Sequence, residues 1–203
     1  PPLDFISYAE ESGLIVPLGR WVILDVVRQV AKWRDKGINL RVAVNISARQ
    51  LADQTIFTAL KQVLQELNFE YCPIDVELTE SCLIENDELA LSVIQQFSQL
   101  GAQVHLDDFG TGYASYARLK TMNVDILKID GSFIRNLLAS SLDYQVVDSI
   151  CRLARMKNMQ VVAEYVESPE IRQAVITLGI DYMQGYDIGV PVPLTQLAEE
   201  MTG

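Results

Sequence analysis

The sequence has no long hydrophobic run, few basic residues and no glycine-rich or serine-rich linker. No apolar stretch reaches the roughly 18 residues that a membrane-spanning helix needs, so no membrane span is expected. Lysine and arginine together number 16 against 27 acidic residues, which gives a formal net charge of −11. A chain this acidic lacks the positive surface with which proteins bind duplex nucleic acid or anionic membranes.

Cysteine and histidine are also scarce, with three cysteines and one histidine. The cysteines are Cys72, Cys82 and Cys151. An odd number cannot all pair in disulfides within the chain, and their spacing is not that of metal ligands. We therefore expect reduced, buried thiols and a cytoplasmic location, because reducing compartments keep thiols free. Zinc is not expected either, since His105 falls inside a predicted strand.

Two kinds of segment alternate along the chain. Six short, apolar, β-branched segments predict strands over residues 41–46, 74–78, 102–107, 124–130, 159–164 and 181–184. Segments of helical period predict helices over residues 20–36, 55–67, 142–156 and 169–178, and one more that Asn86 caps and that ends near Leu100. This alternation predicts a single α/β domain over residues 1–203 with a parallel sheet. The pattern fits a barrel or an open sheet, but no glycine-rich fingerprint follows the first strand, which disfavours a dinucleotide fold.

Polar residues recur where the predicted strands end. Parallel strands bring their carboxyl ends to one rim, so these side chains are expected to converge there. The residues concerned are Asn45, Glu77 and Glu80, Asp107 and Asp108, Lys128 and Asp130, Glu164 and Glu167, and Gln184 with Gly185.

Several carboxylates in one cleft repel each other and raise one another's pKa unless a cation neutralises them. Oxygen donors of this kind predict one or two Mg²⁺ or Mn²⁺ ions. Two such ions suit a phosphate ester, and a lysine in the same cleft adds charge stabilisation. The turn Gly110-Thr111-Gly112 fits either an ordinary loop or a catalytic lid.

Six motifs around these strand ends resemble those of a known family. Val-Asn45-Ile-Ser, Glu77-Leu-Thr-Glu80, Asp107-Asp108-Phe-Gly-Thr-Gly, Leu-Lys128-Ile-Asp130, Val-Ala-Glu164 and Gln184-Gly185-Tyr occur in the order of the EAL domain. This family comprises bacterial cyclic-di-GMP phosphodiesterases. The resemblance extends over nearly the whole chain.

The resemblance implies a modified TIM (β/α)8 barrel, here incomplete with about six of the eight strands, and hydrolysis of cyclic-di-GMP to linear pGpG. It implies Asn45, Glu77, Asp107, Asp108 and Glu164 as metal ligands for Mg²⁺ or Mn²⁺. Asp108 and Glu164 then also belong to the catalytic set with Lys128, which orients the nucleophile, and Glu80, which holds the loop after Asp107. Gln184, Asp130 and Gly185 are implied as substrate-binding residues, with Glu167 supporting them. Ca²⁺ is expected to bind but to inhibit, because its larger and looser coordination positions water poorly.

The sequence departs from the family pattern at several positions. It contains no Glu-Ala-Leu tripeptide, and the first two strands of the barrel are expected to be missing with it, so the chain alone is expected to be weakly active. Tyr165 stands where the family usually has glycine, while Gly131 and Val190 replace basic residues. The alternative to an enzyme is an inactive EAL domain that acts as a cyclic-di-GMP receptor or an interaction module. By family analogy we expect a homodimer and an upstream sensory or cyclase domain.

Overall fold

The structure is a computed structural model that describes residues 2–85, 87–110, 119, 122–194, 196–197 and 201. The predicted cap Asn86 and the turn residues Thr111 and Gly112 lie outside these residues. The chain forms two compact units, one of residues 1–104 with 195–203 and one of residues 105–194.

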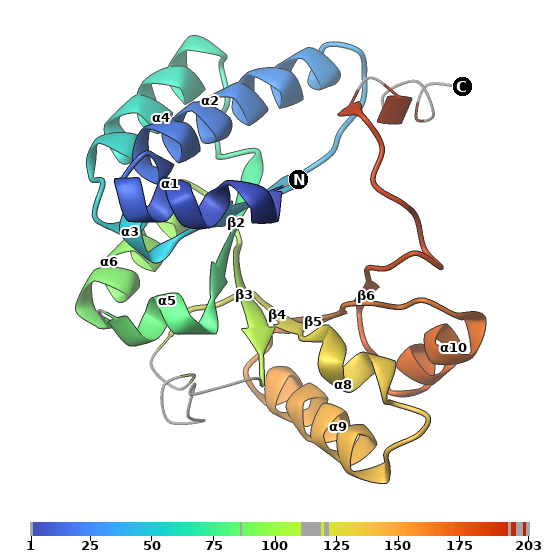
Figure 1. Cartoon of the computed structure of the whole chain (residues 1–203). Helices are drawn as coiled ribbons and strands as arrows, with labels where there is room; N and C mark the ends of the chain where they lie inside the picture. Colours follow the sequence, from blue (N-terminus) through green and yellow to red (C-terminus); the bar gives the residue numbers. More distant parts are fainter. Residues whose placement is uncertain are drawn as a thin grey trace. The chain divides into compact units, whose positions relative to one another are not determined.

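The first unit combines two parallel strands with helices (Figure 1, blue to green). Its strands are β1 (Val42–Ile46) and β2 (Ile74–Thr79), which pair in parallel with Asn45 opposite Glu77. Its helices are the short 3-10 helix η1 (Pro2–Asp4), α1 (Ile6–Ser12), α2 (Ile15–Arg34), α3 (Ala48–Leu51), α4 (Thr55–Glu66), α5 (Glu80–Glu85) and α6 (Asp87–Gln99).

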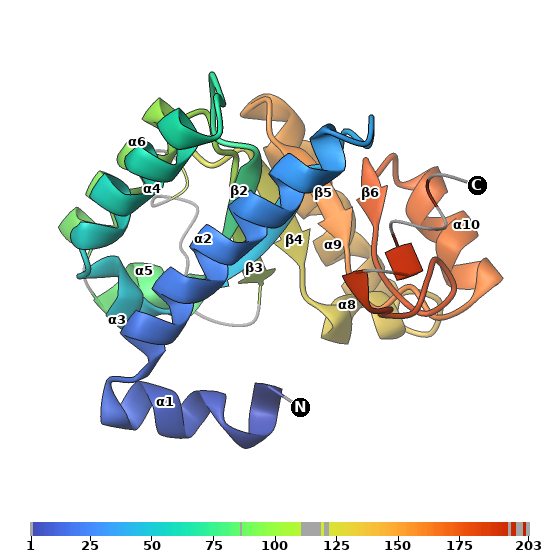
Figure 2. The same cartoon turned by 90° about the horizontal axis from the view of Figure 1, so that it is seen from above.

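Helices α2 and α4 pack side by side (Figure 2) because each carries a stripe of apolar residues at helical spacing. Trp33, Leu60 and Phe97 are among the most deeply buried side chains, and the Phe57 and Phe97 rings lie 4.8 Å apart.

An ion pair links the amino-terminal ends of the two strands. Arg41 Nε lies 3.1 Å from both carboxylate oxygens of buried Asp75, whose Oδ1 also accepts a hydrogen bond from the Gln103 amide.

The second unit contains the strands that follow (Figure 1, yellow-green to red). They are β3 (Val104–Phe109), β4 (Ile126–Ile129), β5 (Gln160–Ala163) and β6 (Tyr182–Met183), and each pairs in parallel with the next. β3 begins on Val104, the last residue before this unit. The helices are α8 (Gly131–Arg135), α9 (Ser141–Met156) and α10 (Pro169–Thr177).

Side-chain caps fix where these helices start. The Ser140 and Ser168 hydroxyls accept hydrogen bonds from the amides of Asp143 and Ile171 at the starts of α9 and α10. Pro169 then occupies the first turn of α10, where its missing N–H costs nothing. β4 is buried throughout, as a strand covered on both faces should be.

The six predicted strands all form, with shifted ends, and the predicted helices form as well. The predicted helix over residues 20–36 begins earlier, at Ile15, because Pro17 lies in the first turn, where proline is tolerated. The short helices α1, α3, α5 and α8 are not predicted from the sequence. Among the described residues, no helix is both long and apolar enough to cross a membrane.

Candidate active site

A bulge at the end of β3 brings two neighbouring acids to the same place. Leu106 pairs with Leu127 and Phe109 pairs with Ile129, so β3 contains one more residue than β4 between these two pairs. Asp108 has φ 56°, a left-handed conformation that aspartate tolerates better than most residues. Side chains alternate between the two faces of a regular strand, and the bulge breaks this alternation. The paired acids at the strand end are predicted from the sequence, whereas the bulge is not.

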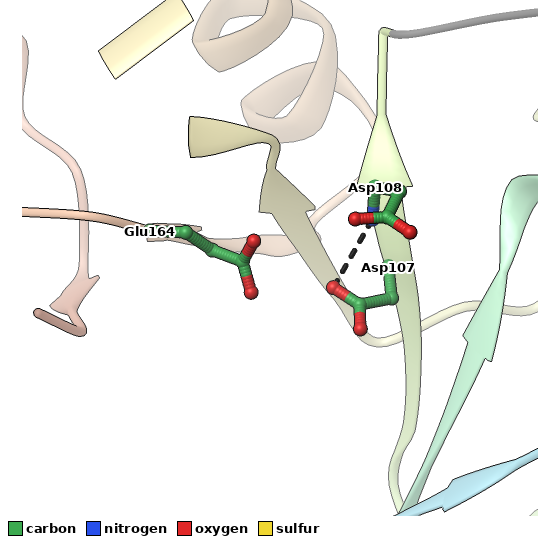
Figure 3. A group of neighbouring side chains, drawn as sticks. All are labelled: Asp107, Asp108 and Glu164. Carbon is green, nitrogen blue, oxygen red and sulfur yellow. Dashed lines mark hydrogen bonds between the residues drawn. The ribbon is translucent and has the colours of Figure 1, made fainter. Parts of the chain in front are cut away.

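Asp107, Asp108 and Glu164 form a cluster of carboxylates (Figure 3). Each offers one oxygen, and these three oxygens all lie within 4.8 Å of one another. Asp107 Oδ1 also accepts a hydrogen bond of 3.1 Å from the Asp108 amide, which fixes the Asp107 carboxylate. Glu164 approaches from the end of β5, where its amide donates to the Ile129 carbonyl at 3.3 Å. The three carboxylates are close enough together to hold a metal ion.

Lys128 lies against this cluster. Its Nζ is 3.0 Å from Asp107 Oδ1 and 2.7 Å from Glu164 Oε1, and the residue is only 4% exposed. A buried ammonium needs such partners, because removing it from water is otherwise costly. The structure therefore places Lys128 next to Asp107, Asp108 and Glu164.

Burial raises the pKa of the Glu164 carboxyl to about 6. Lys128 acts against this rise, while the charges of Asp107 and Asp108 add to it. Burial is the largest cause of the rise, and a cation beside the carboxyl would lower the pKa again by favouring the charged form.

A cavity of about 670 Å³ opens beside the cluster. Its lining includes Asp108 and Glu164 of the cluster, together with the predicted substrate-binding residues. The residues of the lining are Asp108, Asp130, Glu164, Tyr165, Glu167, Gln184, Gly185, Tyr186, Gly189, Val190 and Pro191. Its volume is in the range of small-molecule sites.

Backbone contacts place the predicted substrate-binding residues in this lining. Gln184 extends the pairing of β6 with β5, because its amide donates to the Ala163 carbonyl and its carbonyl accepts from the Val166 amide. Gly185 has a steric reason to be glycine, since a Cβ there would lie 2.3 Å from the Val166 backbone. Asp130 has a second role, because its Oδ1 accepts from the Ser132 amide and caps α8.

The remaining predicted residues lie in the first unit. Asn45 and Glu77 are register partners near the ends of β1 and β2, so they occupy neighbouring positions. Asn45 lies on the exposed face of β1, and Glu77 is buried. Glu80 is buried as the first residue of α5.

Arg135, which is not predicted from the sequence, contacts the pocket residue Tyr165. The Arg135 guanidinium lies 3.8 Å from the centre of the Tyr165 ring. Gly131 lies under the same ring, where a Cβ would be 2.0 Å from Tyr165 Cδ2. No local pattern reveals these contacts, since they join α8 to a residue about thirty positions further along the chain.

The fold and the site together define a parallel α/β protein with an acidic, lysine-containing cluster at the carboxyl ends of its strands. Residues 1–191 match the EAL domain. The chain belongs to the EAL domain family, and the predicted family and fold are confirmed.

The chain is similar to curated relatives at several levels of sequence identity. The chain is 71% identical over 193 residues to the cyclic di-GMP phosphodiesterase PdeR of Escherichia coli, a match that covers 95% of the chain and 29% of that protein. It is 48% identical over 200 residues to the E. coli cyclic di-GMP phosphodiesterase PdeF, covering 98% of the chain and 27% of the relative. The chain thus spans less than a third of the length of these curated relatives.

Solved structures show the same fold. The PaMucR phosphodiesterase in complex with c-di-GMP superimposes with a TM-score of 0.89 at 36% identity, over 97% of this chain and 80% of the other. The EAL enzyme Bd1971 in its cAMP and cyclic-di-GMP bound form gives a TM-score of 0.91 at 28% identity, over 98% and 55%.

Proposed function

We propose that this chain binds cyclic-di-GMP and, with a divalent cation, hydrolyses one of its phosphodiester bonds to give linear pGpG. The observation that carries the proposal is the cluster of Asp107, Asp108 and Glu164 with Lys128 against it. The names of PdeR, PdeF and PaMucR, which are phosphodiesterases, support the same substrate.

The donor set fits a hard cation. Three carboxylate oxygens within 4.8 Å suit Mg²⁺ or Mn²⁺, and the raised pKa of Glu164 reflects negative charge and burial that a cation would offset. Such a cation, when bound, would neutralise these carboxylates and polarise the phosphodiester. Asn45 and Glu77 remain proposed ligands on the strength of the family motif.

In this proposal water attacks the phosphorus, a new P–O bond forms, and the bond to one ribose oxygen breaks, with that oxygen taking up a proton. Lys128 Nζ, held by Asp107 and Glu164, donates a hydrogen bond that orients the water and stabilises charge on the phosphoryl oxygens. Asp108 helps to position the water, and Glu80 keeps the segment after Asp107 in place. Asp130, Gln184 and Gly185 contact the substrate, and Glu167 supports them.

The test is cation-dependent turnover, followed by chromatography of pGpG. We expect turnover in Mg²⁺ or Mn²⁺, binding without turnover in Ca²⁺, and no turnover in excess chelator. Asp107→Asn should reduce kcat by about 10²-fold or more. Asp148→Asn is the matched control, because Asp148 is a carboxylate of the same unit that pairs with exposed Arg152 on α9. Undiminished turnover in chelator would falsify the proposal.

One observation favours a second candidate, a receptor that binds cyclic-di-GMP without cleaving it. Lys128 contacts both Asp107 and Glu164 and so partly supplies the positive charge that a cation would bring. A receptor predicts equal affinity in Ca²⁺, Mg²⁺ and chelator, with no pGpG under any condition. The same measurements therefore separate the two candidates.

The remaining expectations are also proposals. The three buried cysteines form no disulfide with one another, which supports a cytoplasmic location. A homodimer and an upstream sensory or cyclase domain stay predictions.

A further inference from the structure

Tyr165 has a costly backbone conformation directly beside the carboxylate cluster. Its φ is 53°, and the other non-glycine residues with positive φ in the described part of the chain are Asn68, Asn158 and Asp108. Asparagine and aspartate tolerate this conformation, but a bulky aromatic residue there is unusual. The Tyr165 side chain is 45% exposed, so packing in a core does not explain its presence. Strain of this kind is found where a side chain is needed for function.

Two contacts from α8 hold the ring in place. The Arg135 guanidinium lies 3.8 Å from the ring centre and so covers one face. One ring edge lies over Gly131, at a position that leaves no room for a Cβ. These two contacts favour one position of the ring, and Tyr165 lines the cavity.

The cavity offers two kinds of surface. Asp108, Asp130, Glu164 and Glu167 make it acidic, which suits a cation and the N–H groups of a ligand. Tyr165 adds a flat aromatic surface next to these acids. A nucleobase fits this combination, because it stacks on an aromatic ring and presents N–H donors at its edge.

We propose that Tyr165, fixed by Arg135 and Gly131, is a base-stacking residue that determines affinity for a purine base of the cyclic dinucleotide. The inference rests on the proposed function and adds a residue to that site. It also gives a reason for glycine at position 131, because the absence of a side chain there makes room for the Tyr165 ring.

The test measures the Kd of cyclic-di-GMP in Ca²⁺ by calorimetry, together with the Tm of each unliganded variant of the whole chain. Tyr165→Phe retains the ring and should keep Kd within about twofold. Tyr165→Ala and Tyr165→Gly remove the ring, and each should raise Kd about tenfold or more. Tyr165→Gly should also raise Tm relative to Tyr165→Ala, because glycine adopts positive φ without strain.

A matched control separates relief of backbone strain from loss of the ring. Asn158 has φ 56° in the turn after α9 and is absent from the cavity lining. Asn158→Gly should therefore leave Kd unchanged.

A second experiment uses Gly131→Ala, which should displace the Tyr165 ring and lower both Tm and the affinity for cyclic-di-GMP. Adding Tyr165→Gly to it should restore Tm but not affinity, whereas a purely structural ring predicts that both recover.

The outcomes distinguish this inference from the proposed function. If the unaltered chain binds no cyclic-di-GMP, the proposed function fails and this inference fails with it. If the unaltered chain binds and Tyr165→Ala binds equally well, only the stacking role is overturned. If Tyr165→Gly alone loses affinity, backbone restraint of Glu164 is the cause and the stacking role is again overturned.

Discussion

At the residue scale, Lys128 is expected to affect both the stability of the chain and its turnover, because its buried ammonium contacts two carboxylates of the cluster. We expect Lys128→Ala to lower kcat by about 10²-fold or more while Kd changes much less, since its main contribution is made in the transition state. Lys61→Ala, at an exposed lysine of α4, is the control. Turnover in Mg²⁺ and binding in Ca²⁺ on one preparation check this.

The same variant has a second expected effect on stability. Without Lys128, the three carboxylates remain close together and lose the ammonium that contacts Asp107 and Glu164, so Tm in chelator should fall. Mg²⁺ should restore much of the loss, because a cation replaces the missing positive charge. A variant that melts early in chelator and is not stabilised by Mg²⁺ would contradict a metal site at this cluster.

The pKa of Glu164, raised from 4.5 to about 6, predicts a pH dependence of stability in chelator. A carboxyl with a raised pKa binds more protons in the folded than in the unfolded state between these values. The free energy of unfolding contributed by Glu164 is therefore highest below pH 4.5 and falls by about 2 kcal/mol as pH rises to 6 and above.

Glu164→Gln should remove this dependence. Urea unfolding from pH 4.5 to 7 measures it as the difference between the variant and the unaltered chain. Glu11→Gln, at an exposed carboxyl of α1, is the control. An equal pH profile for Glu164→Gln and the unaltered chain would contradict the raised pKa.

At the scale of elements, the amino-terminal ends of β1 and β2 depend on one ion pair. Asp75 is buried, and it accepts hydrogen bonds from Arg41 and from the Gln103 amide. Asp75→Ala should lower the free energy of unfolding by about 3 kcal/mol, because both donors lose a buried acceptor. Asp148→Ala breaks the exposed pair with Arg152 and should cost under about 0.5 kcal/mol. Denaturant unfolding compares the two.

Local sequence signals predicted much of this architecture. Ser168-Pro169-Glu170 predicted the start of α10, and the β-branched segments predicted all six strands, because capping and strand burial depend on neighbouring residues. The prediction for β3 stopped at Asp107, since two acids normally end an apolar strand. The observed strand continues to Phe109 through the bulge, which follows from pairing with β4.

Part of the candidate site could be predicted from the sequence, because several of its residues lie at the ends of predicted strands. Asp107, Asp108, Lys128 and Glu164 lie at strand ends, and parallel pairing brings these ends together. Arg135 carried no such signal, because its contact with Tyr165 depends on how α8 packs rather than on any local pattern. The cap on α8 was missed although Asp130 precedes Gly131 and Ser132, because the helix is a single short turn.

At the scale of the whole molecule, the reactivity of the three cysteine thiols measures whether the chain is folded. Cys72, Cys82 and Cys151 are buried and form no disulfide with one another, and burial raises the pKa of the Cys72 and Cys151 thiols to about 11. These thiols stay protonated at pH 8, and the thiolate is the reactive form. We expect slow reaction with a disulfide reagent in the native chain and rapid reaction of all three thiols in denaturant. Fast reaction of native Cys72 would contradict the buried position.

The contact between Gly131 and Tyr165 also makes these two positions depend on each other. A Cβ at position 131 would lie 2.0 Å from the Tyr165 ring, so any larger residue at position 131 requires the ring to move. Substitutions at the two positions are therefore not expected to be independent. The effect of any side chain introduced at position 131 should depend on whether position 165 carries a large or a small residue.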